Sequence, residues 1–408
     1  MRRRLCDTAG QSLAERTGHT AERLSWLGYA VIGLMATAYG SALPELVHQL
    51  RASYGELSLL FAMQSLGNTV TYFYANHLVD RHGTRQVLLL GFWLFVISTG
   101  LLPLVPSFAT WVLLAFVAGV AFALVDVGGS RLVSDLYRGQ QAQAFNRLNL
   151  WFGVGAISAP LTVGLLNGTG MPVALVFGLA AGLALVGAIG MLALRDVPGE
   201  PAQPGEGLRG NFELWREAGW LRTLTWLVFL YVAAESGFSA WVAAFVHVRS
   251  GLPDAVASLY PAAYQFGLTV VRILIGPRLP FLRLERVLLV GGTAAVGASG
   301  IVVAFGHLPF VVLVGAALTG ACLGPAFPIV LTVAGREAPR REGQAFFFIF
   351  TSLAVAALLV PWAEGQIFTQ VPELAMAVTS LLAAGVALTA ARLGLQTSAL
   401  PPDVSRKA

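Results

Sequence analysis

Long apolar stretches, separated by short polar connections, run through nearly the whole chain. A helix needs about 20 consecutive apolar residues to cross a bilayer, and twelve stretches approach this length. The connections Pro106 to Ala109 and Gly168 to Met171 are so short that the chain must return directly across the membrane. The pattern therefore predicts membrane-spanning helices at residues 24–44, 57–79, 86–105, 109–131, 148–168, 172–194, 221–246, 255–276, 286–306, 309–333, 344–363 and 373–394.

Composition agrees with this pattern. Hydrophobic residues make up 56% of the 408 residues and charged residues 12%, whereas about 25% charged is typical of a soluble domain. The first 23 residues are rich in arginine and contain no apolar core, so they are expected to form a tail and not a cleavable signal peptide. The lipid bilayer is therefore the expected surroundings of this chain.

Basic residues are distributed unevenly over the connections. All but three of the 26 Lys and Arg residues lie in the termini, in the even-numbered connections or at adjoining helix ends; the exceptions are Arg51, Arg249 and Arg272. Because cytoplasmic connections carry an excess of Lys and Arg, both termini are predicted to face the cytoplasm. The net charge of +5 then reflects topology, and no nucleic-acid partner is expected. The use of Arg in place of Lys is typical of a GC-rich bacterial gene, which indicates a bacterial inner membrane.

The two halves of the chain resemble each other. Residues 24–91 align without gaps on residues 224–291, so that Gly67, for example, matches Gly267. Two parallel repeats about an axis along the membrane normal would give this alignment, with the substrate bound where the halves meet. The predicted organisation is a cytoplasmic tail (1–23), a six-helix bundle (24–194), a polar proline-containing cytoplasmic linker (195–220), a second six-helix bundle (221–394) and a cytoplasmic tail (395–408).

The charged connection NHLVDRHGTRQV lies between the second and third stretches. It resembles the signature that major facilitator transporters carry at this place, with Leu78, Asp80, Arg81, Gly83 and Arg85 as the matching residues. Asn76 and Thr84 replace the usual Gly and Arg. The resemblance implies an all-α membrane protein with twelve transmembrane helices in two six-helix bundles, related by a pseudo-two-fold axis, that works as a secondary transporter.

The same resemblance implies a gating role for this connection. Asp80 is expected to accept hydrogen bonds from helix N-termini of the other half, and Gly83 permits a tight turn. Arg81 or Arg85 is expected to pair with Asp135 beyond the fourth stretch, which would lock the cytoplasmic side in one state. Alternatively, these residues only anchor the chain at the cytoplasmic surface.

Several phrases, among them LVDVGGSRLVSDL, YVAAESGFSAW and GPAFP, resemble the fucose permease-like branch of the superfamily. Asp126, Glu235 and Trp241 match acidic and aromatic positions of that branch, whereas Ser130 stands where Asn is frequent. That branch includes proton-coupled sugar symporters, but its members carry diverse cargo, so the resemblance does not imply which substrate is transported. The first stretch contains no deep acidic residue, so a coupling acid at that place is not carried over.

Three charged residues within apolar stretches are candidates for proton coupling or substrate binding: Glu235, Asp126 and Arg272. A charge near the centre of a membrane helix costs at least about 2.5 kcal/mol, so each needs a reason. Glu235 is the first candidate, because a carboxyl group in an apolar environment can bind and release a proton near neutral pH. Alternatively, Glu235 is an arginine-paired structural carboxylate, Asp126 is neutralised by Arg131 or Arg272, and Arg272 forms a fixed ion pair instead of binding an anionic substrate.

Uncharged polar residues on the apolar stretches are candidates for lining a substrate site: Gln64, Asn68, Tyr264, Gln265, Asn149 and Trp241. Aromatic faces beside amide groups suit a sugar, whose C–H face packs on rings and whose hydroxyls take hydrogen bonds. Alternatively, the aromatic residues near helix ends are membrane-interface anchors.

These observations favour a proton-coupled transporter of a small hydrophilic solute, a sugar first of all, that works as a monomer without cofactor or metal. The only lysine is Lys407, so a Walker A loop for ATP hydrolysis is excluded. A proton-driven exporter of drugs or metabolites is the alternative, although Pro160 and Gly164 do not have the spacing of the exporter motif. A membrane sensor or scaffold is a third possibility. An enzyme is not expected, because no catalytic histidine or paired-carboxylate pattern is present.

Overall fold

The computed structural model describes residues 2–137, 141–194, 215–275, 278, 283–337 and 342–398, and within these ranges the regular elements are all helices. They are α1 (Arg2–Leu50), α2 (Tyr54–His82), α3 (Thr84–Leu101), η1 (Leu102–Leu104), α4 (Phe108–Leu136), α5 (Gln141–Thr169), α6 (Leu175–Ala193), α8 (Gly219–Ser250), α9 (Asp254–Ala257), α10 (Tyr260–Ile275), α11 (Leu284–Ala304), α12 (Pro309–Leu323), α13 (Ala326–Glu337), α14 (Glu342–Phe368) and α15 (Pro372–Ser398).

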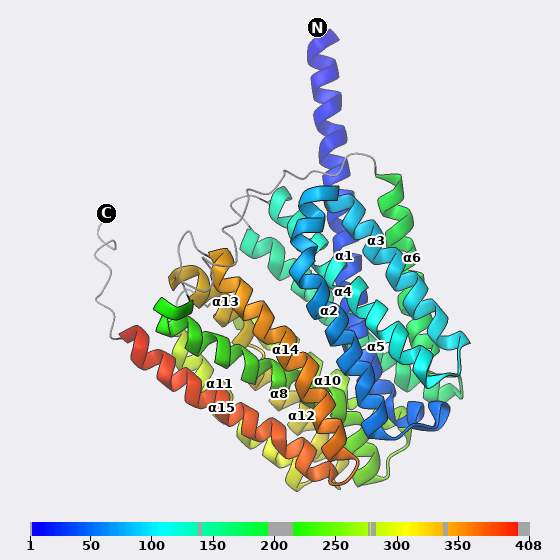
Figure 1. Ribbon diagram of the computed structural model, residues 1–408, viewed down its shortest axis with the longest axis vertical. Helices are drawn as coiled ribbons and strands as arrows, with labels where there is room; N and C mark the ends of the chain where they lie inside the picture. Colours follow the sequence, from blue (N-terminus) through cyan, green and yellow to red (C-terminus); the bar gives the residue numbers. More distant parts are fainter. Residues whose placement is uncertain are drawn as a thin grey trace.

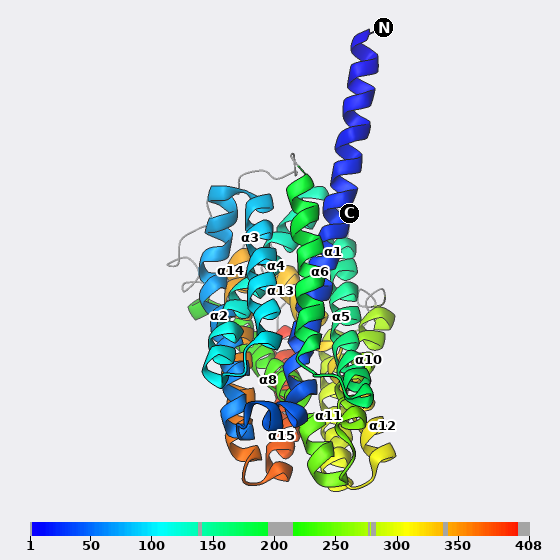
Figure 2. The ribbon, with the colours of Figure 1, turned by 90° about the vertical axis from the view of Figure 1, so that its right-hand side faces the viewer.

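The twelve predicted stretches all appear as helices. The eighth is divided between α9 and α10, and the tenth continues from α12 into α13. The expected tail 1–23 is helical from Arg2 and continuous with the first stretch, and it projects beyond the bundle (Figures 1 and 2). Residues 195–214 of the expected linker and residues 399–408 of the expected C-terminal tail lie outside the described residues.

Ten helical spans in the described ranges are long and apolar enough to cross a membrane. The spans missing from this set are those of α2 and α10. α2 carries the polar residues Gln64, Asn68 and Tyr72, whereas α10 has only 16 residues and includes Arg272. The internal alignment places these two helices on each other.

The helix crossings repeat in the two halves. A Cβ atom on Gly119 of α4 would lie 2.0 Å from the backbone oxygen of Gln64 on α2. A Cβ atom on Gly320 of α12 would lie equally close, at 2.0 Å, to the backbone oxygen of Tyr264 on α10. Small residues allow helix backbones to approach in this way. The sequence repeat therefore corresponds to a repeated packing of α2 on α4 and of α10 on α12.

The halves meet mainly on the side opposite the N terminus. In Figure 1 the first half (blue to green) and the second half (green to red) converge at the lower end and diverge toward the N terminus. Near the lower end, the side-chain amide of Gln366 on α14 donates to the backbone oxygen of Gly55 on α2 over 2.8 Å. Phe73 on α2 and Phe347 on α14 extend this contact toward the other side, with ring centroids 6.2 Å apart.

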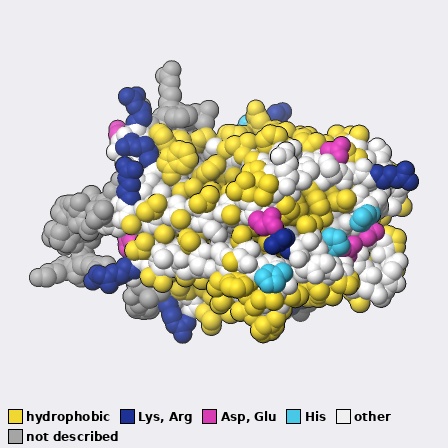
Figure 3. All heavy atoms as spheres, turned by 90° about the horizontal axis from the view of Figure 1, so that it is seen from below, with side chains coloured by type: hydrophobic (Ala, Val, Ile, Leu, Met, Phe, Trp, Pro, Cys, Tyr) yellow, Lys and Arg dark blue, Asp and Glu magenta, His cyan; other side chains and the backbone are white. Residues whose placement is uncertain are grey.

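An aromatic cluster fills the contact between the halves at that end. Trp241 of α8 is fully buried, and its ring stacks on Phe368 of α14 with centroids 4.9 Å apart. Tyr54 and Phe61 of α2 pack against Trp241 from the first half, at 6.2 and 6.0 Å. We call Tyr54, Phe61, Trp241 and Phe368 the aromatic seal. Figure 3 views this side, where carboxylates and histidines stand among apolar side chains.

Candidate substrate and coupling sites

Asp126 of α4 is held by hydroxyl groups and not by a cation. Tyr29 of α1 donates to Oδ1 over 2.6 Å, and Tyr72 of α2 donates to Oδ2 over 2.7 Å. The Tyr29 hydroxyl also lies 2.6 Å from that of Ser130. In the described part of the chain Asp126 forms no ion pair. The alternative in which Arg131 or Arg272 neutralises it is therefore wrong for this conformation.

Arg131 has a different partner because of helix geometry. It lies five residues after Asp126, which turns the two side chains to different faces of α4, but four residues before Asp135, which places those two on one face. Its Nε atom donates to the carboxylate of Asp135 over 3.2 Å.

Glu235 and Arg272 form the second charged group. The Arg272 Nη2 atom lies 3.6 Å from a carboxylate oxygen of Glu235, and both side chains are mostly buried. The same guanidinium donates to the Tyr231 hydroxyl over 2.6 Å and to the backbone oxygen of Gly324 over 3.1 Å. In this conformation Glu235 is therefore paired with an arginine, and three protein atoms, two on α8 and one in the α12–α13 turn, fix the position of Arg272.

The internal repeat relates these two groups. Tyr72 on α2 and Arg272 on α10 occupy aligned positions, and each contacts a carboxylate of its own half. The first half uses a neutral donor and the second half a cation. The two carboxylates are consequently different chemically: one accepts two hydroxyl hydrogen bonds, and the other faces a positive charge.

The candidate lining residues are divided among several environments. Buried polar atoms without a hydrogen-bond partner among the described residues are Asn68 Oδ1, the Tyr264 hydroxyl and Gln265 Oε1. Gln265 also donates to Ser239 of α8 over 3.3 Å, and Gln64 is buried. Such atoms normally have a partner, so water or a solute is the expected one here.

Asn149 and Trp241 occupy other positions. The Asn149 side chain donates to the Phe145 backbone oxygen on its own helix over 3.0 Å. Trp241 belongs to the aromatic seal, and its indole donates to the backbone oxygen of Pro361 over 3.0 Å. Trp241 is therefore neither an exposed sugar platform in this conformation nor a membrane-interface anchor.

The signature connection joins α2 to α3 by a tight turn. Gly83 has a φ of 86°, which favours glycine, and no atom crowds its Cβ position. Arg85 donates to the carbonyl oxygens of Met191, Leu192 and Leu194 at the end of α6, so it caps that helix. The expected pairing of Arg81 or Arg85 with Asp135 is not present in this conformation, in which Asp80 and Arg81 are exposed.

Comparisons with known proteins agree with this arrangement. The model of the Major Facilitator Superfamily matches residues 25–361. The chain belongs to the Major Facilitator Superfamily. It is therefore a membrane transporter of the secondary type and not an enzyme.

Similar proteins match this chain over different lengths. The uncharacterized MFS-type transporter YfkL of Bacillus subtilis is 21% identical over 84% of this chain and 87% of its own length. The sodium-dependent glucose transporter 1 of Rattus norvegicus is 29% identical, but over 34% of this chain and 28% of its own. A crystal structure of the nucleoside transporter NupG superposes with a TM-score of 0.74, 12% identity, and coverage of 94% of this chain and 99% of that one.

One acidic residue of this major facilitator protein was not a sequence-based candidate. Glu364 lies on α14, its side chain is buried with a relative exposure of 2%, and neither carboxyl oxygen has a hydrogen-bond partner among the described residues. The eleventh stretch was predicted to end at residue 363, whereas α14 continues to Phe368. Tyr29 was also missed, because a tyrosine near a helix end is typical of an interface anchor.

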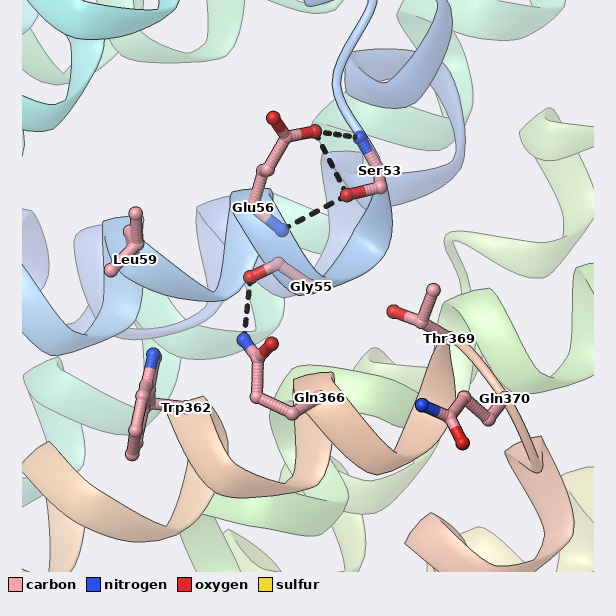
Figure 4. Close-up of a pocket in the computed structure, with 8 residues that line it drawn as sticks. All are labelled: Ser53, Gly55, Glu56, Leu59, Trp362, Gln366, Thr369 and Gln370. Carbon is pink, nitrogen blue, oxygen red and sulfur yellow. Dashed lines mark hydrogen bonds between the residues drawn. The ribbon is translucent and has the colours of Figure 1, made fainter.

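Two surface hollows lie away from these groups. The first, of about 380 Å³, is lined by residues of α2 and α14 on the side of the aromatic seal, among them Glu56, Trp362 and Gln366 (Figure 4). The second, of about 460 Å³, has an almost wholly apolar lining from α5, α10 and α12. Neither hollow includes Asp126 or Glu235, so the charged groups and not these hollows define the candidate site.

Proposed function

We propose that this protein moves a small neutral solute rich in hydroxyl groups, a sugar in the first place, together with protons by alternating access. The observation that carries the proposal is the pair of carboxylates, one in each half, together with buried polar atoms that have no hydrogen-bond partner among the described residues. Hydroxyl groups both donate and accept hydrogen bonds, so a sugar would satisfy the oxygen atoms of Asn68, Tyr264 and Gln265.

Two relatives support this substrate class. A glucose transporter matches part of the sequence, and a nucleoside transporter shares the fold. Sugars and nucleosides both present a hydroxylated ring. The proposal for this chain therefore names hydroxylated rings as the chemistry to be tested, with sugars before nucleosides.

Asp126 is the first choice for the proton-coupling group. It is only partly buried and faces two tyrosine hydroxyls, so no fixed cation compensates its charge. Glu235 has Arg272 as its ionic partner. Protonation of Asp126 would remove a charge without leaving an unpaired arginine, whereas protonation of Glu235 would leave Arg272 as an uncompensated cation.

Alternating access is supported by the way the halves meet. The aromatic seal and the Gln366–Gly55 hydrogen bond close one side, and Asp80 and Arg81 on the other side are exposed. If the basic side faces the cytoplasm, this is an inward-facing arrangement. Asp80 and its neighbours would then engage the second half in the outward-facing state.

The test is transport by the full-length protein in liposomes. Sugars and nucleosides are added at pH 5.5, 7 and 8.5 while charge movement is recorded. A solute-evoked, pH-dependent inward current supports the proposal, and Asp126→Asn should abolish accumulation but retain counterflow exchange. Glu373→Gln, in an exposed ion pair with Arg249, is the matched control. Silence from folded protein with all solutes would favour the exporter, and lipophilic cations would be tested next.

A further inference from the structure

The carboxyl group of Glu364 on α14 is buried against Gly237 of α8. A Cβ atom on Gly237 of α8 would lie 2.1 Å from one carboxyl oxygen of Glu364 and 2.6 Å from its carboxyl carbon. Only a residue without a side chain can occupy position 237 while the carboxyl group stays where it is. Gly237 thus makes the space into which this carboxyl group fits.

The same face of α14 forms part of the aromatic seal. Pro361, Glu364, Gly365 and Phe368 are spaced i, i+3, i+4 and i+7, which places them in one stripe along the helix. Trp241 contacts three members of this stripe: it donates to the Pro361 oxygen, packs on Gly365 and stacks on Phe368. Gly237 lies one turn before Trp241 on α8, so Glu364 sits directly beside the seal.

Glu364 has no compensating group. Both of its oxygens are buried, neither accepts or donates a hydrogen bond within the described ranges, and it takes part in no ion pair there. An ionised carboxylate is strongly disfavoured in such a place, because burial removes its water and nothing replaces it. The sealed arrangement is therefore compatible with the neutral acid and not with the carboxylate.

Several charged or titratable groups on the elements packed against α14 have partners of their own. Glu56 of α2 bonds Ser53, Glu235 of α8 pairs with Arg272, and Arg249 of α8 pairs with Glu373 of α15. His247 of α8 contacts Asp254 over 2.7 Å, and Arg336 of α13 contacts Glu337. Tyr54 of α2 belongs to the seal itself.

We propose that Glu364 is a proton-binding site that controls the aromatic seal: the carboxylate takes up one proton when the seal is open, and the neutral acid permits closure. No other reactant is needed, since the proton comes from water on the side of the seal and returns there on opening. The inference deepens the proposed proton-coupled cycle and rests on it for its role in transport, but its test needs no solute.

Linkage gives the sign and size of the expected effect. The sealed state binds the proton more tightly, so the sealed fraction rises as pH falls. For one proton the ratio of sealed to open protein changes by at most about tenfold per pH unit. Between pH 5.5 and 8.5 the change can therefore reach about a thousandfold, which a distance measurement would detect.

The experiment places spin labels across the seal in the full chain. Cys6 and Cys322 are replaced by alanine, and labels are attached at Gln49→Cys on α1 and Gln370→Cys after α14, both exposed positions. Distances are measured by pulsed electron paramagnetic resonance in lipid nanodiscs. The short-distance population should dominate at pH 5.5 and fall at pH 8.5.

Two neutral replacements test the residue itself. Glu364→Gln should remain sealed at both pH values, and Glu364→Leu, which leaves no polar group to satisfy, should do the same if the amide variant does not fold. Glu373→Gln and His247→Gln are matched controls on the same side and should keep the parental pH response.

Two results would overturn the inference: a parental distance distribution that does not change with pH, or a folded Glu364 variant that keeps the parental response. Solute currents report on the proposed function separately. A pH-dependent seal without any sugar- or nucleoside-evoked current would preserve the site and reject the transport proposal. The opposite result is a proton-coupled solute current in the parent protein together with Glu364 variants whose seal keeps the parental pH response. It would reject the Glu364 site and preserve the transport proposal.

Discussion

The crossing of α2 on α4 depends on Gly119, and Gly119→Ala is expected to weaken both the fold and the Asp126 group. The added Cβ atom would lie 2.0 Å from the Gln64 backbone oxygen, whereas real Cβ contacts essentially never fall below 3.0 Å. α2 must therefore move by at least about 1 Å. A displacement of that size along the bond would stretch the 2.7 Å bond from Tyr72 to Asp126 to about 3.7 Å, beyond hydrogen-bonding distance.

The expected loss of stability follows from overpacking. Extra atoms in a close-packed helix contact cost about 1–3 kcal/mol, and α2 cannot yield locally because the clash is with backbone. Gly182→Ala on α6 is the matched control, since nothing lies within 4 Å of its Cβ position. This control should be neutral or slightly stabilising, by at most about 1 kcal/mol, because alanine is the better helix former.

Both variants would be compared by thermal unfolding in the same detergent, followed by transport in liposomes. Gly119→Ala should unfold at a lower temperature than the parent protein, and Gly182→Ala should not. Equal stability of the two variants would show that the α2–α4 contact is looser than the structure has it, and the reasoning from close approach would be refuted.

Further substitutions probe other contacts. Tyr72→Phe removes one of two hydroxyl donors to Asp126 and should move the pH profile of transport while leaving thermal stability nearly unchanged; an unaltered profile would count against Asp126 as the coupling group. Gln366→Ala removes the hydrogen bonds to Gly55 and Ser58 and should raise the open fraction in the spin-label experiment at every pH. An unchanged distance distribution would show that these hydrogen bonds do not stabilise the seal. Arg85→Ala uncaps α6 and should lower the melting temperature with little effect on solute affinity; a large affinity loss would assign Arg85 a different role.

The architecture was predictable from the sequence because hydropathy determines which segments cross a bilayer. The predicted stretches correspond to helices throughout, and the alignment of Gly67 with Gly267 matches equivalent helix crossings. Each of these glycines lies against the backbone of a neighbouring helix, at 2.2 Å from the Phe116 oxygen and 2.0 Å from the Ala317 oxygen for an added Cβ. The sequence similarity between the halves therefore corresponds to the same close helix packing in each half.

Side-chain partners were less predictable, because they depend on rotation about each helix and on residues far apart in the chain. Glu235 was expected to be a coupling acid or an arginine-paired one, and only the packing of α8 on α10 brings Arg272 to it. The donors to Asp126 come from α1 and α2. The sequence does not distinguish Glu364, because an acidic residue at the end of an apolar stretch usually reaches water. Its burial depends on the absence of a side chain at Gly237 of another helix.

The lack of a cation beside Asp126 has a consequence for selectivity by charge. In the second half, Arg272 balances Glu235, so the field of that pair falls off quickly with distance. In the first half, an ionised Asp126 would be screened only by hydroxyl dipoles, so its field would fall off more slowly with distance. At the proposed solute site, negatively charged solutes would then be repelled before they made any contact, and phosphorylated or carboxylated molecules would be excluded.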